Sequence, residues 1–154
     1  MTDYIISFTF GLMAITFSFS QKIKTPPKKA LKGWAEKIAL SEKRKIKTLA
    51  YTFCSDEELW QMNKQYLSHD TYTDIITFDY SEESAISGEI YISVQRVIEN
   101  AEKLKITFQE ELLRVMAHGI LHLCGYKDKN PIQQKQMRRA EERALKLFKG
   151  LPKA

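Results

Sequence analysis

The chain has 154 residues, of which 44% are hydrophobic and 28% are charged, and its formal net charge is +5 at pH 7. This length suits a single domain that buries its own core, which excludes the small disulfide-stapled class of proteins. The two cysteines, Cys54 and Cys124, lack CxxC spacing, so we expect a reduced cytosolic protein without a disulfide. The excess of lysine and arginine favours a polyanionic partner, although a merely solvated surface explains the lysine-rich stretches 22–32 and 43–47 equally well.

The N-terminal segment is apolar, but it does not resemble a targeting signal. It contains Asp3, and it has neither a basic n-region nor a small-residue cleavage site. From Ala14 onward, Ile15, Phe17 and Phe19 alternate with Thr and Ser, which predicts a half-buried strand rather than a membrane helix. We therefore expect no membrane-spanning segment.

The next part of the chain is predicted to alternate between helix and strand. Thr25-Pro26-Pro27 ends the first strand region, and apolar residues then recur at helical spacing over 31–39. Alternation over 47–53 predicts a second strand. Ser55-x-x-Glu58 is a capping box, and it predicts a helix that extends to about Tyr66.

A hairpin is predicted in the middle of the chain. The loop before it contains His69, which has no partner at ligand spacing and is interpreted as a loop residue rather than a metal ligand. Residues 75–80 and 89–94 are predicted strands, joined by the polar segment 81–84. Thr73-Asp74 before the first strand is compatible with a substrate-positioning role and with an ordinary turn.

The C-terminal part is predicted to be helical. A helix around 94–104 is followed by Thr107-x-x-Glu110, a capping motif for a second helix, and Asn130-Pro131 begins a third that runs to about Phe148. The element order β-α-β-α-β-β-α-α-α predicts an α+β domain, with helices packed around one small mixed β-sheet.

The second of these helices carries a predicted metal site. His118 and His122 are one turn apart, so both imidazoles can reach one ion from the same helix face. Gly125 suits the helix end because it tolerates a left-handed conformation, and the returning chain then brings Asp128 toward the same ion. Three ligands leave one coordination position open, as in catalytic zinc sites, and the spacing matches a zincin-like helix.

This helix is predicted to have one buried face and one functional face. The buried stripe consists of Leu112, Val115, Met116, Gly119, Ile120 and Leu123. Glu111 and Arg114 share the face of the two histidines, and Arg114 either approaches a phosphate or pairs with a carboxylate. On the last helix Glu141 lies on an apolar stripe, where it would either hydrogen-bond a ligating histidine or face water at the helix border.

The run HGILHLCGYKD at 118–128 resembles the signature HGxLHLxGYDH of the YbeY family, which comprises bacterial metal-dependent endoribonucleases. The segment from Asn63 to Tyr66 followed by 70–78 is similar to the family pattern N-x-x-Y-R-x-x-D-x-P-T-D-V-L-S-F, and Gly88-Glu89-Ile90 resembles its G-D-I. Because family members begin near the first strand, the resemblance implies a single metal-dependent hydrolase domain over 13–150. Residues 1–12 are then an N-terminal extension, with Met13 as the natural start.

The chain departs from the family pattern at three positions. Asp128 replaces the third histidine, which zinc accepts and which lowers the positive charge of the site. Leu67 stands where the family has an arginine that is thought to bind the RNA phosphate. Glu89 replaces aspartate and keeps the carboxylate.

The resemblance implies a cytoplasmic, zinc-dependent endoribonuclease specific for single-stranded RNA, which acts in 16S rRNA maturation and ribosome quality control together with the small ribosomal subunit. We expect one Zn²⁺ per chain, held by His118, His122 and Asp128. Since Leu67 cannot bind a phosphate, we expect Lys127, and after it Arg114, to supply the missing positive charge.

Two other functions remain open at this point. A metallopeptidase-like hydrolase is disfavoured because Gly119 stands where zincins have the glutamate that acts as general base. A ribosome-associated binding factor with a mainly structural metal is favoured if catalytic support is absent. The sequence does not identify a general base.

Overall fold

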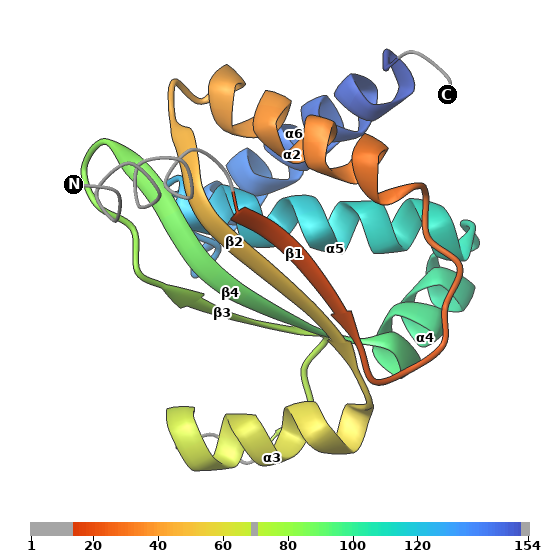
Figure 1. Cartoon of the computed structure of the whole chain (residues 1–154). Helices are drawn as coiled ribbons and strands as arrows, with labels where there is room; N and C mark the ends of the chain where they lie inside the picture. Colours follow the sequence, from red (N-terminus) through yellow and green to blue (C-terminus); the bar gives the residue numbers. More distant parts are fainter. Residues whose placement is uncertain (1–13, 69–70, 152–154) are drawn as a thin grey trace, which may run out of the picture.

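The computed structural model describes residues 14–68 and 71–151, and its elements follow the predicted order (Figure 1). The strands are β1 (Ala14–Phe19), β2 (Lys45–Cys54), β3 (Ile75–Asp79) and β4 (Ala85–Ser93). The helices are α2 (Lys28–Ser41), α3 (Asp56–Leu67), α4 (Val94–Leu104), α5 (Phe108–Leu123) and α6 (Pro131–Lys149). The predictions for residues 1–12, Met13 and His69 lie outside the described residues.

The four strands form one mixed sheet in the order β1-β2-β4-β3. β1 and β4 are both parallel to β2, and β3 is antiparallel to β4, as the predicted hairpin requires. The α+β class and the mixed sheet are therefore confirmed.

Two strands begin earlier than the sequence pattern predicts. β2 starts at Lys45 rather than 47, and β4 starts at Ala85 rather than 89. The two extensions pair with each other, Lys45 with Ala85 and Ile46 with Ile86. A central strand is stabilised by neighbours on both sides, and this tertiary pairing overrides a weak local pattern.

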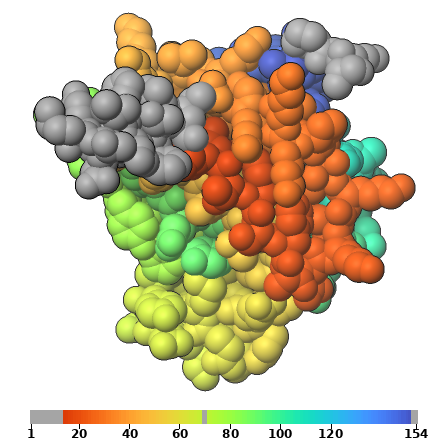
Figure 2. Space-filling view, viewed as in Figure 1, coloured from red at the N-terminus to blue at the C-terminus, as the bar shows by residue number. Residues whose placement is uncertain are grey.

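Helices cover the two faces of the sheet very unequally. Helices α2, α5 and α6 lie on one side and α3 lies on the other (Figure 1). The side of α5 holds the large core, which includes Trp34, Leu49 and Ile90. The side of α3 holds a small cluster of Cys54, Leu59 and Ile76. In the space-filling view, β1 and α2 (red and orange) form the centre and upper right of the visible face and largely hide α5, and α3 (yellow) lies below them (Figure 2).

Helix α5 packs directly against the sheet through two glycines. A β-carbon added at Gly119 would lie 2.7 Å from Ile90 Cδ1, and one added at Gly88 would lie 2.7 Å from the Phe78 carbonyl oxygen and 2.8 Å from Leu123 Cδ2. The predicted buried stripe of this helix is confirmed. Ten of its 16 residues are buried, so only a narrow edge of α5 is left for chemistry.

Helix α6 packs across α2 and α5. The Trp34 indole donates a hydrogen bond to the Ala144 carbonyl at 2.7 Å, and its ring meets Phe148 edge-on. Met137, Ala140, Glu141 and Ala144 form the buried stripe of α6. Among the helices within 14–68 and 71–151, none is long and apolar enough to cross a bilayer.

Candidate metal centre

The accessible edge of α5 presents the two predicted histidines. Thr107 caps the helix, and its hydroxyl accepts a hydrogen bond from the Glu110 amide at 3.1 Å, as predicted. One turn separates His118 from His122, and their rings are perpendicular with centroids 4.5 Å apart. The imidazoles therefore project side by side into solvent-accessible space.

A tight turn after α5 returns the chain to these histidines. Gly125 has a φ of +107°, the conformation predicted for it. Its amide donates to the His122 carbonyl at 3.0 Å, and the Tyr126 amide donates to the Leu121 carbonyl at 3.0 Å. This turn places Asp128 opposite the two imidazoles.

The distances from Asp128 to the two imidazoles fit a tetrahedral metal ion. Asp128 Oδ2 lies 3.3 Å from His118 Nε2 and 3.4 Å from His122 Nε2. Two atoms that each bind zinc at about 2.0–2.1 Å with a tetrahedral angle are themselves about 3.4 Å apart. The donor set also suits an ion of intermediate softness, because it combines imidazole nitrogen with carboxylate oxygen. The triad of His118, His122 and Asp128 can thus hold a metal ion.

Hydrogen bonds fix both imidazoles in the tautomer that a metal requires. His122 Nδ1 lies 2.9 Å from the Tyr126 carbonyl oxygen, which can only accept a hydrogen bond. His118 Nδ1 lies 2.6 Å from Glu141 Oε2. Since both Nδ1 atoms donate, both Nε2 atoms keep their lone pairs directed at Asp128 and the open site.

Glu141 belongs to a buried charge network behind His118. Arg114 donates to Glu141 Oε1 at 3.0 Å, and its Nε donates to Glu111 at 2.7 Å. Arg114 thus pairs with carboxylates, which was one of its two interpretations, but both carboxylates are almost fully buried rather than at the surface. Burial alone would raise the pKa of Glu141, but hydrogen bonds and attraction from His118 and Arg114 lower it below its usual value. Glu141 is thus an ionised acceptor that orients His118.

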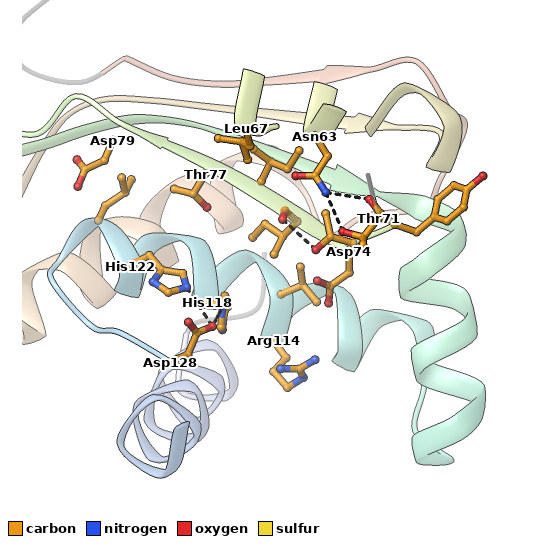
Figure 3. Close-up of a pocket in the computed structure, with 16 residues that line it drawn as sticks. Asn63, Leu67, Thr71, Asp74, Thr77, Asp79, Arg114, His118, His122 and Asp128 are labelled. Carbon is orange, nitrogen blue, oxygen red and sulfur yellow. Dashed lines mark hydrogen bonds and ion pairs between the residues drawn. The ribbon is translucent and has the colours of Figure 1, made fainter. Parts of the chain in front are cut away.

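The triad opens onto a pocket of about 700 Å³ between α5 and the α3–β3 segment (Figure 3). His118, His122 and Arg114 line one wall, and Asn63 and Leu67 belong to the other. This volume is within the usual range of ligand sites, roughly 300–1,000 Å³. Leu67, which replaces the arginine of the family pattern, therefore does face the site.

Asp74 also lines this pocket. The sequence left its role open between positioning a substrate and forming an ordinary turn. Its carboxylate accepts a hydrogen bond from Asn100 at 3.3 Å. Burial raises the pKa of Asp74, against the opposing attraction of His118 and Arg114. No local signal distinguishes this aspartate from a turn residue, because its position in the pocket depends on how α5 packs on β3.

The two predicted cations lie in different places. Arg114 lines the pocket. Lys127 adjoins Asp128 along the chain, but its side chain lines a separate hollow with Tyr126 and Gln133. The turn that brings Asp128 to the histidines thus directs Lys127 elsewhere.

Gly119 lies against the sheet rather than in the pocket. An added β-carbon would already lie 2.7 Å from Ile90 Cδ1, so a glutamate directly after His118 would collide with the buried Ile90 side chain. Packing therefore disfavours the general base of zincins at this position.

A family model described as Endoribonuclease YbeY matches residues 15–149 of this chain. The chain belongs to the YbeY family. This confirms the resemblance seen in the run 118–128.

Several curated YbeY endoribonucleases are similar to this chain over most of its length. The protein of Flavobacterium psychrophilum is 46% identical over 134 residues, which cover 87% of this chain and 96% of that protein. The protein of Bacteroides fragilis (strain ATCC 25285) is 45% identical over 139 residues, covering 89% and 99%. The protein of Christiangramia forsetii is 50% identical over 117 residues, covering 76% and 82%.

A solved structure supports the fold of this YbeY family chain. The solution structure of a Thermotoga maritima protein is 30% identical, has a TM-score of 0.61, and is matched over 90% of this chain and 89% of that one.

Proposed function

We propose that this chain is a zinc-dependent endoribonuclease that cleaves single-stranded RNA and acts in 16S rRNA maturation and ribosome quality control. The observation that carries the proposal is the triad of His118, His122 and Asp128, whose ligand atoms all lie within 4.8 Å of one another beside a pocket. Family membership supports RNA as the substrate, since the relatives described above are named endoribonucleases. The proposed domain comprises residues 13–150, with 1–12 as an extension.

Zinc is the proposed ion, with one per chain. Two imidazoles and one carboxylate suit it, and three protein ligands leave a position for substrate or water. Such an ion would supply Lewis-acid polarisation of a phosphate oxygen. Asp128 lowers the charge of the site relative to three histidines, which widens its tolerance toward other divalent ions.

The charges of the pocket support a metal that acts on the substrate. Among the described lining residues are the carboxylates of Asp74, Asp79 and Asp128, against the single guanidinium of Arg114. Without a divalent ion this lining would repel a phosphate. We therefore propose that RNA binding itself, and not only cleavage, requires the metal.

The remaining site residues have proposed supporting roles. Glu141 orients His118 by accepting its Nδ1 proton, and Arg114 holds Glu141 while it keeps positive charge at the pocket wall. Lys127 is exposed next to Asp128 along the chain, and we propose that it attracts the RNA backbone at the outer side of the turn. We further propose that the protein works in the cytoplasm and associates with the small ribosomal subunit, where its rRNA substrate is found.

Two alternative functions compete with this proposal. One is a metallopeptidase, and the other is a non-catalytic binding factor with a structural metal. Packing at Gly119 disfavours the peptidase, because the usual base would collide with Ile90. The open pocket beside the triad disfavours a structural metal, since structural zinc sites are closed by four protein ligands.

One assay separates the three functions. Protein loaded with zinc is incubated with single-stranded RNA and with casein, beside a sample treated with chelator and one re-supplied with zinc. We expect cleavage of RNA alone, lost with chelator and restored by zinc, and absent in His118→Ala and His122→Ala. Cleavage of casein would establish the peptidase, whereas RNA binding without cleavage in the zinc-loaded protein would establish the binding factor.

A further inference from the structure

Two arginines approach the buried carboxylate behind His118, and they are held very differently. Arg114 Nη1 lies 3.0 Å from Glu141 Oε1, and Arg114 also binds Glu111 through two further nitrogens. Arg138 Nε lies 3.9 Å from the same oxygen, which is too long for a hydrogen bond. The Arg138 side chain is 63% exposed, against 20% for Arg114. Arg138 thus keeps its donors available, whereas Arg114 has committed its own.

The position of Arg138 is fixed by its neighbours on α6. Residues 134, 138 and 141 lie along one stripe of this helix, at i, i+4 and i+7. Gln134 donates to the Asp128 carbonyl oxygen at 3.2 Å, and Glu141 contacts His118 at 2.6 Å. Arg138 therefore lies between two residues that each contact a residue of the metal triad, and Figure 3 shows α6 running beside Asp128.

In a nuclease, an exposed guanidinium on α6 near the metal triad can bind a phosphate of the substrate. The pocket itself is rich in carboxylates, and Leu67 offers no charge on the opposite wall. The strand that enters the pocket carries a phosphate on every nucleotide, and a planar guanidinium binds phosphate oxygens through two parallel hydrogen bonds.

We propose that Arg138 binds the phosphate of a single-stranded RNA next to the one that is cleaved at the triad, and so adds, from α6 and outside the pocket lining, a positive charge that the Leu67 wall lacks. This inference rests on the proposed ribonuclease function. The ligand is a phosphodiester of RNA, and Arg138 is a substrate-binding residue rather than a metal ligand.

The matched control is the neighbouring Arg139. It is also exposed, but it lines a different hollow with Gln136 and Arg143. Arg138→Ala and Arg139→Ala remove the same charge from adjacent positions of α6, so only a specific contact distinguishes them. Arg138→Lys keeps the charge and removes the two-pronged geometry.

Binding is measured by fluorescence anisotropy of a short single-stranded 2′-O-methyl RNA with zinc-loaded proteins over a range of KCl concentrations, and zinc content is determined in every sample. Arg138→Ala should raise Kd about tenfold at low salt, and it should lower the slope of log K against log salt by about 0.7, the value for one phosphate of a single strand. Arg139→Ala should change Kd less than about twofold, and Arg138→Lys should restore the slope but only part of the affinity. Zinc content should be equal in all proteins.

The outcomes separate this inference from the function on which it rests. Suppose that the parent protein cleaves RNA. If the Kd of Arg138→Ala then equals that of the parent, or equals that of Arg139→Ala, Arg138 makes no specific contact. In that case the inference is overturned and the proposed function stands. If the zinc-loaded parent neither binds nor cleaves single-stranded RNA, both the function and the contact are refuted.

Discussion

The two walls of the pocket differ in how firmly they are held. The wall of α5 rests on the main core, where Gly88 and Gly119 bring the helix and sheet into close contact. The wall of α3 rests on a cluster of three buried residues, and its exposed end includes Leu67. The two histidines lie on the firm wall, where small displacements would spoil coordination, whereas the opposite wall is lightly held.

The side chain of Asn63 connects the lightly held wall to the segment before β3. Asn63 is buried, and its amide donates to the Thr71 carbonyl oxygen at 2.8 Å and lies 3.3 Å from the Thr71 hydroxyl. This difference between walls predicts that changes on the α5 side alter metal binding, whereas changes on the α3 side alter substrate binding.

The largest effect is expected at Asp128. Asp128→Ala removes one of three proposed ligands, and we expect zinc affinity to fall at least about 100-fold, or about 2.7 kcal/mol. Asp128→His should retain zinc, because it restores the ligand of the family pattern. Zinc affinity is measured by competition with a chromophoric chelator. An Asp128→Ala protein that binds zinc like the parent would remove Asp128 from the ligand set.

The next effect is expected behind His118. Glu141→Gln replaces a charged acceptor by a neutral one, and loss of such support typically costs about 10–100-fold in metal affinity. The exposed neighbour Glu142→Gln is the matched control and should bind zinc like the parent. If both variants bound zinc with equal affinity, Glu141 of α6 would not support the metal ligands on α5.

Packing of the firm wall is tested at Gly88. Gly88→Ala places a methyl group against Phe78 and Leu123, and we expect a loss of about 2 kcal/mol in the free energy of urea unfolding. Gly33→Ala is the control, because no atom lies within 4 Å of its added β-carbon. Gly33 lies within α2, so this second variant should be more stable by up to about 1 kcal/mol. The comparison of walls fails if Gly88→Ala is as stable as the parent.

The smallest effect is expected on the wall of α3. Asn63→Ala leaves the Thr71 carbonyl without its donor and should cost about 1 kcal/mol in stability. We expect KM for single-stranded RNA to rise a few-fold while zinc affinity stays unchanged. Gln65→Ala, an exposed change on the same helix, serves as the control and should leave both quantities at the parent level. If zinc affinity also fell in Asn63→Ala, the two walls would not be independent of each other.

Local patterns in the sequence were sufficient to predict the triad as a group. His118, His122, Gly125 and Asp128 are close along the chain, so helix geometry and one turn determine how they meet. The same holds for the Thr107 cap and for the apolar stripe of α5. The pairing of Glu141 with His118 was one of two open interpretations, because a stripe position does not reveal which helix lies opposite.

Features that depend on distant contacts could not be predicted in this way. The early starts of β2 and β4 arise from their pairing with each other. Glu111 is completely buried because it pairs with the guanidinium of Arg114. In the sequence it is only a charged residue on a polar helix face, so its burial could not be predicted. Asp74 and Leu67 line the pocket beside the triad only because α5 packs on β3.

The hydrogen bond between His118 and Glu141 forms late during synthesis of the chain. A ribosome makes the chain from its N-terminus, so both imidazoles of α5 are synthesised before the carboxylate that orients one of them. His122 finds its acceptor within the same turn, at Tyr126, but His118 must wait until α6 has left the ribosome and docked. A nascent chain therefore carries an incompletely oriented centre, and a protein that cuts RNA acquires its full geometry only after its own translation has passed residue 141.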